Sequence, residues 1–515
     1  MKALVINLTR FGDLLQTQPI ITALADQGYK VGVMCLKNFA GTMQLLRNVS
    51  RTFPLPGAYL LAALDRDWRE AINIFESYCA EIENEFDPSL VINLTPSVSS
   101  RLITLRLRKG REVRGFAMDE LGFNADTSRW AGFLQMASAN RGSSPFNVVD
   151  LFSKVAGIDE TAPFTLAEPS SEMKIAALKL LENPEPGAEG FVGFQPGASE
   201  ERRRWPVEYF RELGFRLWKE KRRVPVLLGT ENEKELGKRI QEGANFPAVN
   251  LMGATSLQEL AAVLRRLDLL VTNDTGTMHL AAGSGTPLAA IFLATAQPWD
   301  TGPAAEGGCC FEPDLDCHPC PFGQKCFCEH LCRRKVEPDT VFAAVSSFLD
   351  DGKWPLIENM GARVYLTGRD EFGHICLSSL SGHEQTDRHK WIVLQRELYR
   401  RFLDGDDLSA VHFTGVEFSA DLRSRLLKTL GDCRDVLFLM SKQALLLEAN
   451  PVEGMKIKFL ANLQRIQDIL SSCPELSVLS SMWAVESRAH DSMAGLKHQM
   501  SVYTSLVNAI IGIVE

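Results

Sequence analysis

The segment with the strongest chemical signature is Asn273-Asp274-Thr275-Gly276-Thr277-Met278-His279-Leu280-Ala281-Ala282. It follows the apolar run Leu269 to Thr272, which is typical of a buried parallel strand, and its small residues open a helical pattern. In open α/β sheets, ligands bind at the carboxyl ends of strands, where backbone N–H groups and the helix dipole favour a phosphate. The segment therefore predicts a phosphate-binding turn or, alternatively, a tight structural turn with Asp274 as a helix cap.

A second candidate, Asp13, occupies a similar position near the start of the chain. Lys2 to Leu8 has the pattern of a buried strand, Gly12 permits a tight turn, and an amphipathic pattern follows. We therefore expect the carboxylate at a helix N-terminus, where it serves as an N-cap or as a general base. The two roles conflict, because a carboxylate held by backbone N–H groups has a lowered pKa and is a poorer base.

Two α/β units are needed to position these groups. Strand and helix patterns alternate from residue 2 onward and restart at Phe191 to Gln195, which predicts two Rossmann-like units with parallel sheets. We expect the first unit over residues 1–165, a linker rich in Pro, Glu and Ser over 166–190, and the second unit over 191–350. Residues 355–515 carry apolar residues at helical spacing, which predicts a mostly helical extension of unknown role.

Composition excludes several classes of protein. The chain has 515 residues with 45% hydrophobic side chains, typical of about three globular domains and not of a disordered or multi-span membrane protein. A formal net charge of −9 indicates no general attraction to nucleic acid or anionic lipid. The apolar stretch Ala3 to Leu8 is short for a secretory signal, and no run is long enough to span a membrane. We therefore expect a cytoplasmic protein.

Cysteines gather in one short stretch. Of the twelve in the chain, seven lie between Cys309 and Cys332, in a segment that we interpret as an insert. The spaced members of this group are Cys317, Cys320, Cys326, Cys328 and Cys332. Close thiol pairs in one loop can supply a tetrahedral thiolate site for structural iron or zinc. The alternatives are reduced buried thiols, as expected in a reducing compartment, or a disulfide formed on isolation.

The segment 273–282 resembles the nucleotide-binding motif of glycosyltransferase family 9, the bacterial ADP-heptose heptosyltransferases. Four further motifs follow the family's order, so that the resemblance covers residues 1 to about 345 and leaves the tail from about 355 outside it. They are Arg10-Phe11-Gly12-Asp13-Leu14-Leu15 with Pro19; Pro196-Gly197-Ala198 with Arg203-Arg204-Trp205-Pro206; Leu251-Met252-Gly253 with Thr255-Ser256-Leu257 and Glu259-Leu260; and Gly285-Thr286-Pro287 with Thr301-Gly302-Pro303.

The resemblance implies a GT-B fold, in which two Rossmann-like domains face each other across a cleft. The first domain would hold the acceptor and the second the sugar nucleotide, and no cofactor would be required for catalysis. The implied reaction is an inverting single displacement. A carboxylate takes the proton of the acceptor hydroxyl while positive groups stabilise the departing diphosphate.

The matching positions carry the implied roles. Asp13 aligns with the general base, and the sugar-nucleotide ligands would be Arg203, Glu231, Asp274, Thr275, Gly276 and His279. Arg203 stands where the family has Lys, which keeps the charge but is not an equivalent group. A further departure is Leu293-Ala294, where the family has a Gly-Pro turn. The alternatives are a solvated basic run at Arg203, a helix charge at Glu231 and simple packing for His279.

The function that these observations imply is transfer of a heptose from ADP-heptose to lipopolysaccharide core or a related acceptor. The expected partners are the sugar nucleotide and a lipid A–core or protein acceptor, without nucleic acid and with peripheral contact at the inner membrane. A basic run in the first unit is either a solvated face or a docking surface for an anionic acceptor: Arg101, Arg106, Arg108, Lys109, Arg111 and Arg114. The alternative functions are protein glycosylation, with the tail recognising the acceptor, and a non-catalytic GT-B scaffold.

Overall fold

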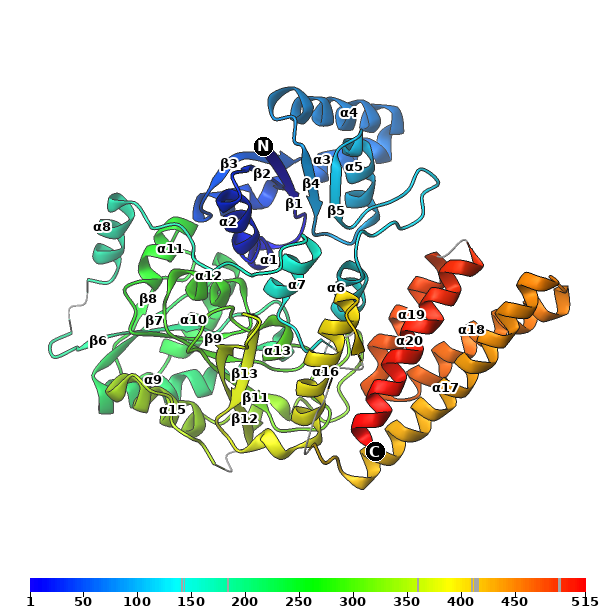
Figure 1. The fold of residues 1–515 in the computed structure, drawn as a ribbon. Coiled ribbons are helices and arrows are strands. Elements are labelled where there is room, and N and C mark those ends of the chain that lie inside the picture. The colour runs from blue at the N-terminus through cyan, green and yellow to red at the C-terminus, as the bar shows by residue number, and fades with distance from the viewer. Residues whose placement is uncertain are drawn as a thin grey trace. The chain divides into compact units, whose positions relative to one another are not determined.

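The computed structural model describes residues 1–139, 142, 144–182, 185–358, 361–408, 411, 416–489 and 492–515. Asn183 and Pro184, inside the predicted linker, lie outside the described residues. The chain forms two compact units. Unit 1 contains Met1–Ala117 and Phe146–His383, and unit 2 contains Met118–Pro145 and Glu384–Glu515. Figure 1 shows the elements of both.

Unit 1 begins with a parallel sheet of strand order β3-β2-β1-β4-β5. Its strands are β1 (Lys2–Ile6), β2 (Lys30–Leu36), β3 (Val49–Leu55), β4 (Leu90–Asn93) and β5 (Glu112–Gly115). Its helices are α1 (Phe11–Leu15), α2 (Gln18–Asp26), α3 (Gly57–Arg66), α4 (Trp68–Glu85) and α5 (Val98–Arg108), with a 3-10 segment at Lys37–Leu45. The central strand β1 is buried from Ala3 to Ile6, as expected for a parallel strand covered on both faces.

A second sheet in unit 1 has the strand order β13-β12-β11-β10-β9-β6-β7-β8. Its parallel strands are β6 (Gly190–Gln195), β7 (Arg223–Leu227), β8 (Val249–Asn250), β9 (Leu269–Asn273), β10 (Leu288–Ile291) and β11 (Cys309–Pro313). The antiparallel hairpin of β12 (Ala362–Arg369) and β13 (Ile375–Ser379) extends the sheet next to β11. Residues beyond 355 thus contribute two strands to this sheet before the helical region begins.

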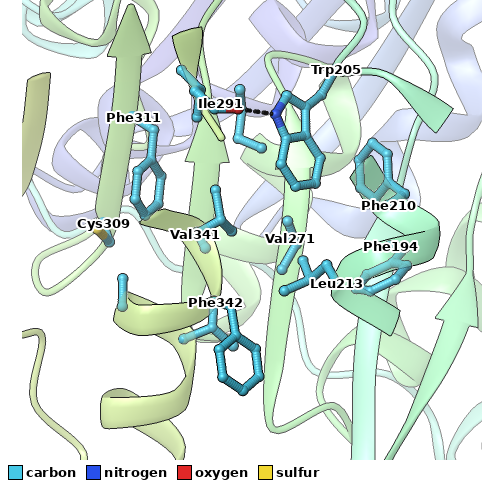
Figure 2. Close-up of a cluster of buried hydrophobic side chains, with 14 of the residues drawn as sticks. Phe194, Trp205, Phe210, Leu213, Val271, Ile291, Cys309, Phe311, Val341 and Phe342 are labelled. Atoms are coloured by element: carbon cyan, nitrogen blue, oxygen red, sulfur yellow. Dashed lines mark hydrogen bonds between the residues drawn. The ribbon is translucent and has the colours of Figure 1, made fainter. Parts of the chain in front are cut away.

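The remaining helices of unit 1 lie before, between and after the parallel strands of the second sheet. They are α7 (Val148–Val155), α8 (Ser171–Leu180), α9 (Val207–Lys221), α10 (Lys234–Gln241), α11 (Leu257–Leu264), α12 (Gly276–Ser284), α13 (Pro298–Thr301), α14 (Cys332–Lys335) and α15 (Pro338–Asp351). The core on one face of this sheet surrounds Trp205, whose ring centroid lies 4.9 Å from that of Phe210. The indole of Trp205 donates to the carbonyl of Val336 at 2.7 Å (Figure 2). This bond fixes the chain two residues after Arg203.

Unit 2 is helical. It combines α6 (Arg129–Ala139) with α16 (Asp387–Asp404), α17 (Ala420–Ala449), α18 (Glu453–Ser471), α19 (Ser477–Ala489) and α20 (Met493–Val514). Tyr503 is the centre of its aromatic core, with ring centroids 5.0 Å from Trp483 and 5.3 Å from Phe402. Among the described helices, none combines the length and the apolar character that crossing a membrane requires. The predicted α/β class with a mostly helical extension is confirmed.

Candidate functional site

The candidate site is built around the start of α12, which begins directly after β9. Thr275 is the N-cap residue of this nine-residue helix, in an extended conformation, and its side chain does not cap the helix. The Oγ1 atom of Thr275 is buried and has no hydrogen-bond partner among the described residues. The first N–H groups of an α-helix also lack partners within the helix. The turn therefore presents several polar groups that a bound anion would satisfy.

Two glycines bring α1 against this turn. A Cβ atom added to Gly276 would lie 2.5 Å from a ring carbon of Phe11, and one added to Gly12 would lie 3.0 Å from His279 Cδ2. Real Cβ atoms essentially never approach another atom closer than 3.0 Å. The two glycines thus allow the first turns of α1 and α12 to touch, which brings together the ends of β1 and β9.

Asp13 lies in the first turn of α1, and the N-cap residue of that helix is Arg10. The backbone carbonyl of Asp13 accepts hydrogen bonds from Asn7 Nδ2 and Thr17 Oγ1, each at 3.3 Å. Asn7 and Thr17 also bond to each other at 2.9 Å. Two side chains thus fix the backbone of Asp13, while its half-buried carboxylate interacts electrostatically with His279.

His279 is buried one turn into α12, and burial lowers its pKa. The negative charges of Asp274 and Asp13 oppose this shift. The Gln16 amide donates to His279 Nε2 at 3.4 Å, which leaves the ring proton on Nδ1. His279 Nδ1 and Gln16 Oε1 are both buried without a hydrogen-bond partner in the described structure. The imidazole is therefore neutral near pH 7 and retains an unused donor.

Arg203 and Asp274 form an ion pair at the edge of the site. Both side chains are largely buried, and Thr301 Oγ1 also donates to Asp274 at 3.4 Å. Arg203 Nη1 donates to Ser199 Oγ at 3.1 Å, whereas its Nε has no partner within the described chain. The guanidinium is thus held by two neighbours and keeps one donor for a ligand.

Asn273 organises the loops around this pair. Its amide nitrogen donates to the carbonyl of Pro196 at 2.8 Å, and its carbonyl oxygen accepts from the Trp205 N–H at 3.0 Å. One buried side chain therefore ties the end of β9 to both flanks of the segment that carries Arg203.

Glu231 stands apart from these residues. It is exposed, pairs with Lys234 at 2.7 Å and lies over Gly253 at the end of β8. The strand before it, β7, is separated from β9 by β6. The structure brings Asp13, Asp274, Thr275, Gly276 and His279 together with Arg203, and leaves Glu231 at a distance along the same sheet edge.

The turn that departs from the family pattern is strained. Ala294 has φ +55°, a left-handed conformation that favours glycine, and its carbonyl accepts from Cys320 N–H at 2.8 Å. The neighbouring Thr295 Oγ1 is buried and lacks a partner among the described residues. The cysteine-rich loop is therefore attached to the turn that closes this side of the site.

Three sulfurs of that loop are close together. Cys328 Sγ lies 3.6 Å from Cys317 Sγ and 3.7 Å from Cys326 Sγ. Backbone N–H groups of His330 and Cys328 lower the pKa of Cys326, whereas hydrogen bonding with Cys317 raises that of Cys328. In the part of the chain that the structure describes, no group of three or more His, Cys, Asp or Glu side chains is arranged to hold a metal ion. The iron or zinc site predicted at Cys317, Cys320, Cys326, Cys328 and Cys332 is therefore not supported.

The basic run of the first unit is largely neutralised. Arg106, Lys109 and Arg111 all pair with Glu83, at 3.1 to 3.3 Å. Arg101 is buried, donates to the carbonyl of Ala117 at 2.7 Å and lies over the Phe116 ring. These contacts explain the run as structural more simply than as a docking surface.

Sequence reasoning assigned no role to four residues that support the site through side-chain bonds, namely Gln16, Asn273, Ser199 and Thr301. Gln16 lies one helical turn after Gly12 and so faces the same side, which was the available signal. Asn273 is the first residue of the segment 273–282 and ends a fully buried strand, where a polar side chain needs partners. Thr301 stands in a quoted motif, but no local pattern marks it as a partner of Asp274 or marks Ser199 as a partner of Arg203.

Residues 83–330 match the model of glycosyltransferase family 9 (heptosyltransferase). The chain is similar to lipooligosaccharide heptosyltransferase 2 of Haemophilus influenzae, with 29% identity over 164 residues, 30% of this chain and 46% of that protein. It is also similar to lipopolysaccharide heptosyltransferase 1 of Escherichia coli K12, with 24% identity over 299 residues, 57% of this chain and 88% of that protein.

A solved structure of E. coli ADP-heptose lps heptosyltransferase II matches with a TM-score of 0.50 and 19% identity. The match covers 68% of this chain and 99% of that one. This likeness confirms the predicted GT-B fold. The chain spans less than half the length of the first curated relative that it matches.

Proposed function

Since the chain carries a glycosyltransferase family 9 (heptosyltransferase) domain, we propose that it is an inverting glycosyltransferase. The proposed donor is ADP-heptose, and the proposed acceptor is lipopolysaccharide core or a related molecule, in keeping with the names of its relatives. A lipid-anchored acceptor lies at a membrane surface. We therefore also propose that the enzyme is cytoplasmic and contacts the inner membrane peripherally.

The observation that carries this proposal is a group of buried polar atoms without partners in the described structure. Thr275 Oγ1, Arg203 Nε and His279 Nδ1 all belong to the residues around the start of α12. A buried polar atom without a hydrogen bond costs about 1–3 kcal/mol, so three such atoms around one helix start need a physical explanation, which a bound ligand supplies. A diphosphate supplies the acceptor oxygens that these three donors lack.

Asp13 is the proposed general base. Its carboxylate accepts the proton of the acceptor hydroxyl as that oxygen forms a bond to the anomeric carbon of the donor sugar. The bond from the same carbon to the diphosphate breaks on the opposite face, so the configuration inverts. Arg203 and the N–H groups at the start of α12 meet the negative charge that develops on the leaving nucleotide. No metal ion or cofactor takes part in this proposal.

The Arg203–Asp274 pair gives the donor site its own charge balance before the nucleotide arrives. Without Asp274, a largely buried guanidinium would lack a counter-charge. Donor binding adds two phosphate groups next to this pair, and the free Nε of Arg203 can bond to them without breaking it. The proposed role of Asp274 is therefore to hold Arg203 in place.

Thermal denaturation with a panel of sugar nucleotides tests the proposal. A ligand at a hundred times its dissociation constant adds about 2.7 kcal/mol of stability. ADP-heptose should stabilise the wild type and Asp13→Asn but not Arg203→Ala, and both variants should transfer heptose far more slowly than the wild type. If no sugar nucleotide raises the melting temperature, the chain is a non-catalytic GT-B scaffold and the proposal fails.

The acceptor class needs a separate test. The family match ends at residue 330, and the larger segment of unit 2, Glu384–Glu515, lies outside it, which would suit recognition of a protein acceptor. Deleting residues 355–515 is a poor test, because it removes β12 and β13 from the second sheet. Parallel assays of the intact enzyme with lipid A–core and with protein acceptors separate the two cases, and modification of protein alone would overturn the lipid acceptor.

A further inference from the structure

The outer face of α17 carries large apolar side chains that are exposed. Phe438, Leu445 and Leu446 are 65%, 53% and 56% exposed, and Leu439 lies beside them. The opposite face of the same helix packs into unit 2 through buried residues that include Met440, Ala444 and Leu447. The second half of α17 is therefore apolar on both sides. A helix that packs against its own protein on one side only usually has a polar outer side.

These side chains form a narrow seam. At about 100° per residue, Phe438, Lys442, Leu445 and Ala449 fall within about 60° of one another around the helix axis. Their spacing of four, three and four residues is the spacing by which helices pack along a shared stripe. Leu439 and Leu446 border this seam on one side. The face thus has the dimensions of a helix-packing surface.

Two opposite charges stand on the same face of α17, one on either side of Phe438 and Leu439. Asp435 and Lys442 are both exposed, and neither has an ion-pair partner among the described residues. They lie seven residues apart, or about 10 Å along the axis. The midpoint between them falls between Phe438 and Leu439. The ammonium of Lys442 lies 5.0 Å from the centre of the Phe438 ring, over the seam itself.

We propose that this face binds the same face of a second copy of the chain, with the two α17 helices antiparallel. In that arrangement Asp435 of each copy faces Lys442 of the other, so that one pair of residues makes two ion pairs. Phe438 and Leu439 then pack around the two-fold axis. In a parallel arrangement Asp435 would face Asp435 and Lys442 would face Lys442, so the charges select the antiparallel one.

Gly431 fits the same geometry. In the antiparallel pair it stands level with Leu446 of the second copy, because both lie equally far from the midpoint at residues 438 and 439. A Cβ atom added to Gly431 would meet nothing within 4 Å in the described structure, so its own fold does not require glycine there. The missing side chain leaves room for the leucine of the other helix.

The charges near the seam disfavour an anionic membrane as the occupant. Asp435 lies on this face of α17, and Glu448 and Glu453 lie on either side of the turn that follows the helix. Helices that bind anionic bilayers are instead rich in Lys and Arg on their polar face. The self-complementary pattern of one acid and one base is instead what an interface between identical copies requires.

Charge reversal tests the proposal. Sedimentation velocity should give twice the 57.2 kDa chain mass for the wild type at high concentration. Lys442→Asp and Asp435→Lys should each weaken dimerisation at least about tenfold, because each puts like charges opposite one another twice. The double variant Asp435→Lys/Lys442→Asp should restore it. Lys458→Asp, an exposed lysine on α18, is the matched control and should leave the dimer unchanged.

Three outcomes would overturn the proposal. One is a monomeric wild type at every concentration, and another is a double variant as weak as either single one. The third is association with phosphatidylglycerol vesicles that Phe438→Ser abolishes while the protein stays monomeric, since that assigns the face to lipid. All substituted side chains are exposed, and circular dichroism confirms that each variant is folded.

Discussion

The junction of α1 with α12 and the outer face of α17 are incomplete in opposite ways. At the junction, polar atoms such as Thr275 Oγ1 and His279 Nδ1 are buried without partners in the described structure. On α17, apolar groups such as Phe438 and Leu445 are exposed. Buried polar atoms call for a small polar ligand that can enter, whereas exposed apolar groups call for a surface large enough to cover them. The kind of missing contact thus indicates the kind of missing partner.

The largest expected effect follows from removing the proposed base at the junction. Asp13→Asn keeps the size of the side chain but cannot accept a proton, so heptose transfer should fall by about 10²–10⁴-fold. The dissociation constant for ADP-heptose should stay near the wild-type value. Asp26→Asn, at the exposed end of α2, is the control for loss of one negative charge. Steady-state kinetics and calorimetry together separate the two quantities, and equal turnover in both variants would remove Asp13 from the mechanism.

A methyl group at Gly276 should open the junction without touching a charge. The added Cβ would lie 2.5 Å from the Phe11 ring, so one of the two helices must move, at a cost of about 1–3 kcal/mol. The melting temperature and the affinity for ADP-heptose should both fall. Gly512→Ala in α20, where a Cβ meets nothing within 4 Å, should leave both unchanged or raise the melting temperature. Equal behaviour of the two variants would contradict the close contact.

A polar substitution on the exposed face of α17 should weaken the proposed dimer. Phe438→Ser should weaken self-association by about tenfold or more, since it removes the ring nearest the proposed two-fold axis. The ring is mostly exposed, so the free energy of unfolding of one copy should change by about 0.5 kcal/mol at most. Donor affinity should not change at all. A loss of donor binding in this variant would mean that the two regions are not independent.

Protonation of His279 should appear in the stability of the protein. Burial lowers its pKa below the ordinary 6.5, so the unfolded chain binds its proton more readily than the folded one. The contribution of this residue to stability is therefore complete above pH 6.5 and declines as the pH falls through the folded pKa. His279→Gln should flatten this part of the pH profile in chemical denaturation. An unchanged slope between pH 7 and pH 5 would contradict the assignment.

The α/β class could be predicted because each strand and helix has a recognisable hydrophobic pattern in its own stretch of sequence. Runs such as Ala3 to Ile6 and Leu269 to Val271 are apolar throughout, which is typical of central parallel strands. The pairing of distant segments carries no local pattern. Residues 362–379 complete the second sheet, and α6 joins the C-terminal helices through a bond from the Trp130 indole to Asp404 at 2.7 Å. Neither partner could be identified from its own stretch of sequence.

The candidate site likewise has a part that the sequence predicts and a part that only the fold reveals. Asp274, Thr275, Gly276 and His279 are consecutive or one turn apart, so the sequence itself brings them together. The bond from Gln16 to His279 joins residues 263 positions apart, and only the fold reveals it. Their roles in binding and catalysis stay predictions. The strain at Ala294 was also invisible, because alanine shows no preference that would signal a left-handed backbone.

That strain gives the smallest expected effect. Ala294 has φ +55°, a conformation that costs a non-glycine residue about 1–2 kcal/mol, so Ala294→Gly should stabilise unit 1 by about 0.5–1 kcal/mol. The gain is less than the full strain, because glycine also makes the unfolded chain more flexible. Ala296→Gly, two residues further along the chain, is the control. It should destabilise the protein, since Ala296 is buried and its backbone does not have a positive φ. Differential scanning calorimetry measures both changes. If Ala294→Gly stabilises the protein without loss of donor affinity, the left-handed turn has a role in packing alone. If it stabilises the protein but weakens donor binding, the left-handed turn helps to shape the donor site at the junction of α1 and α12.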